Sequence, residues 1–269
     1  MDLPITKTSS LQIDCVLEIN VVYPRTPFNN NSVQIMLSLS KTPLLDGLGF
    51  VELIDTFGDD LTVVNAARVS FAKESTTFEP RDAKLIEYLA AHNHITPFFH
   101  PQIRLRLKMP IYVAREWFRH TVGFARNEMS RRYVDTKPEC YTPMEWSMRE
   151  RDVNVKQGSK ATPVENATEL RESIRAFQES AVVFYEHLLS CKVAPEIARG
   201  VLPQSMYTEF IETGSLSAYA RLCGLRLDPH AQQEIQIFAQ AVSDLLAAKF
   251  PVSWAALVGE QRVARPSVE

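Results

Sequence analysis

The stretch QIRLRLKMPIYVAREWFRHTVGFARNEMSRRY, residues 102–133, decides the fold class of this chain. Its first part alternates apolar residues with Arg104, Arg106 and Lys108. A period of two with one charged side is typical of a half-buried strand that has a basic face. Pro110 then stands at the head of IYVAREWFRH, and proline is favoured at the start of a helix. The stretch therefore predicts a strand that leads directly into a helix.

The helix and the segment after it carry the polar side chains. On a helix, Glu116, Arg119 and His120 would share one face, because their spacing is i, i+3, i+4. If residues 124–132 are extended, Glu128, Ser130 and Arg132 would point to one side. Such a side could contact a polar heterocycle and a phosphate together, although a solvated basic face remains the alternative for the strand itself.

The rest of the chain mixes strand and helix patterns irregularly. A strand is expected at 49–57, and further helices are expected after Asp59-Asp60 and from Pro80, Pro163 and Asp228-Pro229. The helix expected from Pro163 has an apolar stripe that suits a bundle or subunit contact. Its members are Leu170, Ile174, Phe177, Ala181, Phe184 and Leu188. We expect an α+β fold, a mixed sheet flanked by helices.

The N-terminal segment has its own pattern. Residues 11–22 and 33–39 alternate apolar and polar side chains around the turn-rich PRTPFNNNS, which predicts a β-hairpin-like element. We divide the chain into an N-terminal extension, 1–45, and a catalytic domain, 46–269. The stretch 147–162 is polar and is expected to be a surface loop.

Composition limits the class of protein. The 269 residues are 45% hydrophobic and 23% charged, which is typical of a globular chain. The net charge of −3 is unlike that of a protein that coats nucleic acid along its whole surface. Cys15, Cys140, Cys191 and Cys223 are widely spaced, as in reduced intracellular proteins. We find no apolar run of the roughly 20 residues that a membrane span needs. A cytoplasmic protein is the expectation, with no membrane partner.

Positive charge is concentrated locally. From Arg104 to Arg132 there are seven arginines and one lysine against two acids, interleaved with aromatic residues. Guanidinium groups suit phosphates and planar carbonyl groups. Gly47 and Gly49 lack the third glycine of a dinucleotide fingerprint, because Glu52 stands in its place. A bound nucleotide or flavin would therefore be held by side chains.

These residues resemble the signature of the flavin-dependent thymidylate synthases, RHRxxSxNExSxRY. Here the signature begins Arg119-His120-Thr121 and is one residue longer. Five further segments agree in order and spacing, which extends the resemblance from about residue 49 to the C-terminus. They are FVELIDTFGDDL at 50–61, NAARVSF at 65–71, HNHITPF at 92–98, ARGVLP at 198–203 and LRLDPHAQQEIQ at 225–236.

The resemblance implies a homotetramer of α+β subunits with active sites built from several chains. It implies FAD as cofactor, NADPH and methylenetetrahydrofolate as co-substrates, and C5 methylation of dUMP to dTMP. It also implies that Arg226 is the catalytic group that stabilises the ionised uracil ring. The implied substrate-binding residues are Glu116, Arg119, Ser130, Arg131, Arg132, Arg199 and Arg226.

The implied flavin-binding residues come from several segments. They are Ser70, Thr96, Arg119, His120, Thr121, Glu128, Ser215, Ser217, Arg221 and His230. Four of them depart from the family pattern, namely Thr121, Ser215, Ser217 and Arg221. Arg126 and Arg221 partly offset the arginines absent at 121 and 217.

Alternatives remain open at this point. UMP is an alternative substrate, and a single-stranded nucleic-acid-binding module is an alternative class. Cys140 or Cys223 would be a nucleophile or a buried, inert thiol. His92, His94 and His100 would be metal ligands or pocket histidines, and no metal site is expected because no further ligand stands at a suitable spacing.

Overall fold

A computed structural model describes residues 41–134, 136–153 and 159–259. The two alternating segments of the expected N-terminal hairpin, 11–22 and 33–39, lie outside the described residues. The last residues of the expected extension form β1 (Lys41–Leu44), which pairs with β2 (Gly49–Phe57). The domain boundary near residue 45 stays a prediction.

A five-stranded sheet, ordered β1-β2-β3-β7-β4, forms the centre of the molecule. Strand β3 (Gln102–Pro110) lies between β2 and β7 (Tyr207–Ser215), and β4 (Phe124–Glu128) is at the edge beside β7. Every pairing among these strands is antiparallel, which refines the expected mixed sheet. The α+β class and the strand predicted at the start of residues 102–133 are confirmed.

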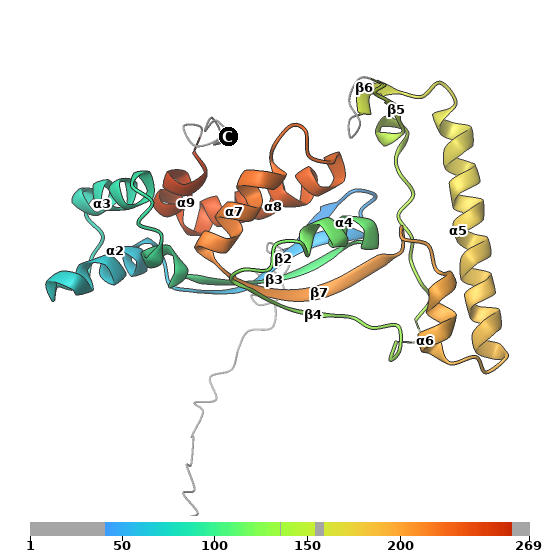
Figure 1. The fold of residues 1–269 in the computed structure, drawn as a ribbon, viewed down its shortest axis with the longest axis horizontal. Helices are drawn as coiled ribbons and strands as arrows, with labels where there is room; N and C mark the ends of the chain where they lie inside the picture. The colour runs from blue at the N-terminus through green and yellow to red at the C-terminus, as the bar shows by residue number, and fades with distance from the viewer. Residues whose placement is uncertain (1–40, 135, 154–158, 260–269) are drawn as a thin grey trace, which may run out of the picture.

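One face of the sheet is covered by helices (Figure 1). They are α4 (Ile111–Trp117), α7 (Leu216–Arg226), α8 (Gln233–Lys249) and α9 (Pro251–Val258). Ile103, Leu105 and Leu107 of β3 are fully buried in the core with Phe238 of α8. The intervening Arg104 and Arg106 are exposed, so alternation along β3 separates the core from a basic face as expected.

Helices α2 (Asp60–Arg68) and α3 (Pro80–Ala91) form one end of the molecule. Asp59 is the N-cap of α2, because its carboxylate accepts the Thr62 backbone N–H at 2.9 Å. Asp60 has a different partner: its carboxylate oxygens accept the backbone N–H groups of Val252 and Ser253, each at 2.9 Å. The first turn of α9 is thus capped from α2.

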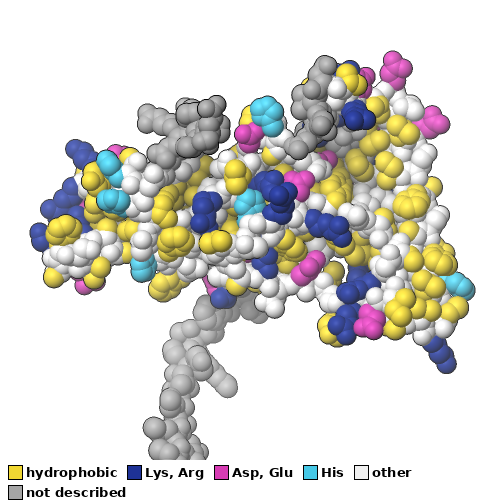
Figure 2. All heavy atoms as spheres, in the orientation of Figure 1, with side chains coloured by type: hydrophobic (Ala, Val, Ile, Leu, Met, Phe, Trp, Pro, Cys, Tyr) yellow, Lys and Arg dark blue, Asp and Glu magenta, His cyan; other side chains and the backbone are white. Residues whose placement is uncertain are grey.

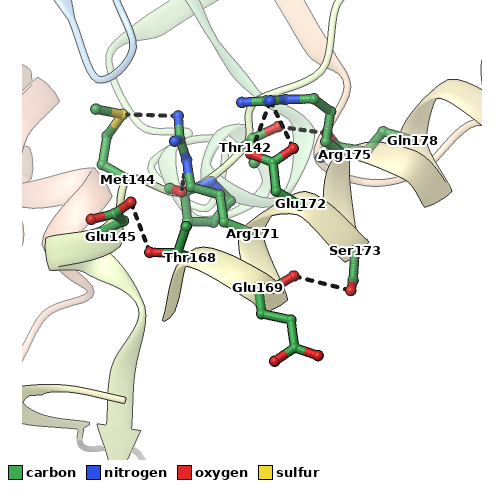
Figure 3. A network of polar contacts seen from close by, with 11 residues as sticks. Thr142, Met144, Glu145, Thr168, Glu169, Arg171, Glu172, Ser173, Arg175 and Gln178 are labelled. Carbon is green, nitrogen blue, oxygen red and sulfur yellow. Dashed lines mark hydrogen bonds and ion pairs between the residues drawn. The ribbon is translucent and has the colours of Figure 1, made fainter. Parts of the chain in front are cut away.

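Helix α5 (Ala167–Ser190) stands apart from the sheet, at the opposite end from α2 and α3 in Figure 1. It begins four residues after Pro163, which ends β6, so the expected start was wrong. Figure 3 shows how polar contacts attach it to residues 142–145. Arg171 donates to the Pro143 carbonyl oxygen at 3.1 Å, and Thr142 donates to Gln178 at 2.7 Å. These contacts leave the predicted apolar stripe largely exposed.

Two further boundaries differ from expectation. Part of the expected loop 147–162 belongs to a small hairpin of β5 (Arg149–Arg151) and β6 (Ser159–Pro163). The hydrogen bonds between these strands join backbone groups, so polar side chains do not prevent the pairing. Helix α8 begins at Gln233, not directly after Pro229, because Asp228 accepts the His230 backbone N–H and holds a turn there. Between α5 and β7 lie α6 (Pro195–Ala198) and a 3₁₀ turn, η4 (Arg199–Val201).

Candidate active site

Arg226, the last residue of α7, lies in a polar cluster with residues from the α4 region. Its Nε donates to His120 Nε2 at 3.0 Å, and its Nη2 donates to the Glu116 carbonyl oxygen at 3.0 Å. Its Nη1 is 3.4 Å from the Glu116 carboxylate. Contacts on all three nitrogens fix the plane of the guanidinium, and 18% of the side chain stays exposed. Three predicted site residues are therefore brought together.

The route by which these residues meet differs from the expected one. Helix α4 ends at Trp117, so Arg119 and His120 lie beyond it and the predicted shared helix face was wrong. A turn follows instead, in which the His120 backbone N–H donates to the Trp117 carbonyl oxygen at 3.2 Å. The turn brings the His120 ring to Arg226, while Arg119 stays exposed.

The His120 ring is neutral at ordinary pH. Burial, together with the positive charges of Arg226, Arg126 and Arg119, lowers the pKa of His120 to about 4. A neutral ring has one nitrogen that accepts a hydrogen bond. Because Arg226 donates to Nε2, the ring proton is on Nδ1.

A buried carboxylate adjoins this cluster. Glu212 of β7 is fully buried and forms an ion pair with Arg126 of β4. Trp117 Nε1 donates to both Glu212 carboxylate oxygens at 3.2 Å. Sequence reasoning missed Glu212, although the alternation along β7 places it on the same buried face as Phe210. A charged residue on the apolar face of a strand was the available signal.

A second group of predicted residues lies just beyond β4. Ser130 Oγ accepts from Arg199 Nη1 at 3.5 Å, and it also accepts the Arg132 backbone N–H at 3.3 Å. Arg132 pairs with Glu196 of α6 at 3.3 Å. Because β4 ends at Glu128 and a turn follows, the expected common side of Glu128, Ser130 and Arg132 on one extended segment was wrong. The turn nevertheless gathers a hydroxyl and two guanidiniums, which suit a phosphate.

Arg131 points elsewhere. It is 7% exposed, donates to the Thr136 carbonyl oxygen, and lines a cavity with Lys108 and Tyr207. Glu128 accepts a hydrogen bond from the buried Thr208 hydroxyl at 2.6 Å. Both residues are thus held by neighbours within the chain.

The altered segment from Thr121 packs on the start of α7. Arg221 donates to the Val122 carbonyl oxygen at 2.7 Å. Gly123 has φ +82°, and a Cβ there would lie 3.0 Å from Ala218 Cβ, so the close approach requires glycine. Ser215 caps α7 by accepting the Ala218 backbone N–H at 3.2 Å. Ser215 and Ser217 are each 2% exposed, whereas Thr121 and Arg221 are exposed; their contact with a flavin stays a prediction.

The remaining predicted flavin contacts are scattered. Ser70 lies in a 3₁₀ turn after α2, and Thr96 begins another before β3; both are exposed. His230 is exposed beside Asp228, with Nδ1 3.0 Å from the carboxylate. In Figure 1 the end formed by α2 and α3 lies far from α6, which precedes Arg199. One chain therefore does not gather all the predicted site residues.

The alternative of a cysteine nucleophile finds little support. Burial raises the pKa of Cys140 to about 11 and raises the pKa of Cys223 above its ordinary value, which leaves both thiols protonated and weakly nucleophilic. The rings of His92 and Tyr88 lie 4.1 Å apart. Within the described ranges, we find no group of three side chains placed to hold a metal ion, and no helix there is long and apolar enough to cross a bilayer.

Comparison with known proteins identifies the family. The thymidylate synthase complementing protein family matches residues 52–252. The chain belongs to this family. A flavin-dependent thymidylate synthase of Thermus thermophilus is 40% identical over 214 residues, covering 80% of this chain and 77% of the relative. One of Thermosipho melanesiensis is 41% identical over 206 residues, covering 76% and 87%.

Solved structures agree with this family assignment. The UMP/dUMP methylase PolB from Streptomyces cacaoi bound with 5-Br dUMP has a TM-score of 0.72 and 30% identity, and the match covers 80% of this chain and 97% of PolB. The same protein bound with 5-Br UMP has a TM-score of 0.71 and 29% identity. The predicted family, the α+β fold and the enzyme class, a methyltransferase, are confirmed.

Proposed function

We propose that this protein methylates C5 of dUMP to give dTMP, with FAD as cofactor and NADPH and methylenetetrahydrofolate as co-substrates. The fixed guanidinium of Arg226 is the observation that carries the proposal. Family membership and the names of the relatives support the reaction class.

Arg226 suits a uracil ring on chemical grounds. Methylation at C5 requires electron density on that carbon, and the density is available when the ring carries negative charge on N3 and its carbonyl oxygens. A guanidinium already fixed in place stabilises such a charge without reorganising, and needs no covalent nucleophile. Neutral His120 helps, because it accepts from Arg226 and adds no competing positive charge.

The group beyond β4 suits the nucleotide phosphate. Ser130, Arg132 and Arg199 offer a hydroxyl and two guanidiniums within one turn and the neighbouring η4. Glu196 holds Arg132 at 3.3 Å in the structure, and an incoming phosphate would compete for that guanidinium. Charge-assisted contacts of this kind fix the position of a ligand as well as its affinity.

The residues near the altered segment fit an anionic flavin nucleotide. Arg119 is exposed and, in the described part of the chain, has no carboxylate partner. Arg221 is also exposed, and one of its nitrogens holds the Val122 carbonyl. Two guanidiniums beside a glycine turn match the charge of a diphosphate. When bound, the reduced flavin supplies the hydride that completes the methyl group.

The scatter of predicted residues over the chain supports an assembly of four chains with shared sites. Ser70 and Thr96 would reach a flavin held near Arg119 of another chain. The assembly, the source of hydride and the carbon donor remain parts of the proposal.

A visible absorption spectrum tests the cofactor directly. Protein saturated with FAD is expected to show bound flavin, and NADPH oxidation is expected to accelerate when dUMP is added. A protein that shows no flavin difference spectrum contradicts the proposal.

UMP is the second candidate substrate. The extra residue lies between Thr121 and Ala125, beside the predicted nucleotide residues, and PolB has been solved with both bromo-nucleotides. The ratio of kcat/KM for dUMP and UMP identifies the preferred substrate. The two differ by one 2′-hydroxyl, and recognition of that group is worth a few kcal/mol at most. A preference for UMP of about tenfold or more would replace dUMP in the proposal and leave the chemistry intact.

A further inference from the structure

Arg126 connects a buried carboxylate to the predicted catalytic group. Its Nε pairs with Glu212, and its Nη1 donates to the His120 carbonyl oxygen at 2.5 Å. The His120 ring in turn accepts from Arg226 Nε at 3.0 Å. A continuous chain of contacts therefore runs from Glu212 through Arg126 and His120 to Arg226.

The surroundings hold the Arg126 side chain tightly. Its guanidinium lies over the rings of Phe124 and Phe118, at 4.6 Å and 5.3 Å from their centroids. Phe124 itself packs against Gly214, where an added Cβ would meet the ring at 2.5 Å. A side chain at 214 would displace Phe124, so glycine there permits the arrangement.

The Glu212 carboxylate is equally restrained. Trp117 donates to both carboxylate oxygens at 3.2 Å, and the Glu212 side chain has no exposed area. Burial raises the pKa of Glu212, while the neighbouring guanidinium acts in the opposite direction. The pair is thus fixed from β4, β7 and α4 at once.

Stability alone is a poor reason for this pair. Burying two charges removes them from water, and apolar side chains of similar size often serve stability as well or better. Arg126 Nη2 is also buried with no hydrogen-bond partner among the described residues. The free-energy cost of burying this pair has a reason if the pair does what apolar groups cannot do. Here the Arg126 guanidinium holds the His120 carbonyl oxygen in place.

We propose that Arg126 and Glu212 are positioning residues, which fix the backbone at His120 and thereby hold the His120 ring against Arg226. The inference rests on the proposed function for the role of Arg226. It assigns neither residue a contact with the substrate. Without the pair, the turn after α4 would shift and the Arg226 guanidinium would lose one of its three contacts.

The main variant replaces both charges at once. Arg126→Met with Glu212→Leu leaves no unpaired buried charge, so the fold is expected to persist. Its Tm is expected to fall by several degrees, because Trp117 Nε1 loses its acceptor. Misplacement of about 1 Å at a reacting group can cost on the order of 100-fold in rate. We expect kcat to fall about tenfold or more while KM for the nucleotide changes by less than about threefold.

A second variant covers failure of the first to fold. Arg126→Lys keeps a positive charge beside Glu212, but one ammonium cannot reproduce the fork that reaches both the carboxylate and the His120 carbonyl. It should lower kcat in the same direction. The control is Arg104→Gln with Asp55→Asn, which removes an exposed ion pair of 3.3 Å between β3 and β2, and it should retain kcat.

Crystal structures of the same variants give a readout that is independent of activity. The Arg226 Nε to His120 Nε2 distance is expected to exceed about 3.5 Å in the pair variants and to stay unchanged in the control. Retention of that contact, or a kcat within about twofold of wild type for Arg126→Lys, would overturn the inference. If wild type methylates no uracil nucleotide, the proposed function fails, and the distance still decides the positioning.

Discussion

Arg226 makes three contacts with two residues, His120 and Glu116, that orient it, and it has enough exposure to meet a ligand. Ser130 differs, because its hydroxyl lies beside the exposed side chains of Arg132 and Arg199 and would offer a ligand one hydrogen bond. At the scale of single residues, the first should control the rate and the second should control binding.

Replacement of each residue by alanine separates these roles. Arg226→Ala is expected to lower kcat by about 100-fold or more, because a fixed donor to developing negative charge is lost. Ser130→Ala is expected to raise KM about tenfold, because one hydrogen bond to a charged group is lost, with turnover still detectable. Steady-state kinetics with dUMP measures both. Loss of all turnover in the serine variant together with near-normal kcat in the arginine variant would contradict the assignment.

His120 makes stability depend on pH. Its pKa is lowered to about 4 in the folded protein, from an ordinary value of 6.5. Between these values the unfolded chain binds more protons, so the free energy of unfolding falls as pH falls from 6.5 toward 4. In His120→Gln this part of the pH dependence should disappear. Urea unfolding at several pH values measures it, and an unchanged slope in the variant would show that another group titrates.

Helix α5 carries large apolar side chains that are exposed in the described structure. Phe177 and Phe184 are 65% and 50% exposed, although both belong to the stripe predicted from the sequence. Figure 2 shows hydrophobic side chains gathered over the part of the molecule that α5 forms. Exposed apolar surface of this kind supports the proposed contact with another chain.

Assembly should therefore depend on the stripe. Four chains of 30.5 kDa would give roughly 120 kDa by light scattering, as we propose. Phe177→Ser with Phe184→Ser is expected to shift the mass to smaller species, because the apolar area that drives association is reduced. Ser173→Ala with Ser180→Ala, on the same helix, is the matched control, since each hydroxyl bonds within the helix. A variant that keeps the wild-type mass would exclude this stripe from the contact.

Asp60 holds together parts of the molecule that are distant in sequence. It lies in α2, yet it accepts the backbone N–H groups at the start of α9, across about 190 residues. It is 8% exposed, so water does not easily replace these bonds. The contact ties the end formed by α2 and α3 to the last described helix.

Loss of this carboxylate should destabilise the whole domain. Asp60→Ala is expected to lower the free energy of unfolding by about 2–3 kcal/mol, because two buried backbone donors lose their acceptor. Asp59→Ala is expected to cost about 1 kcal/mol, the usual value for an exposed N-cap. Denaturant unfolding of both variants measures the difference. A smaller loss at Asp60 than at Asp59 would mean that water or a rearranged helix satisfies α9.

Residue patterns were enough to predict the family, the α+β class, the basic alternation of β3 and the residue types of the candidate site. These follow from short-range patterns: period-two alternation, capping residues and a spaced set of arginines, histidine and serine. The same patterns misplaced the end of α4 and the extended reach of β4, because helix and strand ends depend on tertiary contacts as well as local preference.

How these residues combine became visible in the folded chain. It brought Arg226 to His120 and Glu116 across more than a hundred residues, and it gave Asp60 a partner in α9 that its position beside Asp59 did not indicate. It also revealed Glu212 and Arg126 as a buried pair. The physical reason is that hydrogen bonds and ion pairs between distant segments form only after the chain is folded, so their partners leave no periodic trace in the sequence.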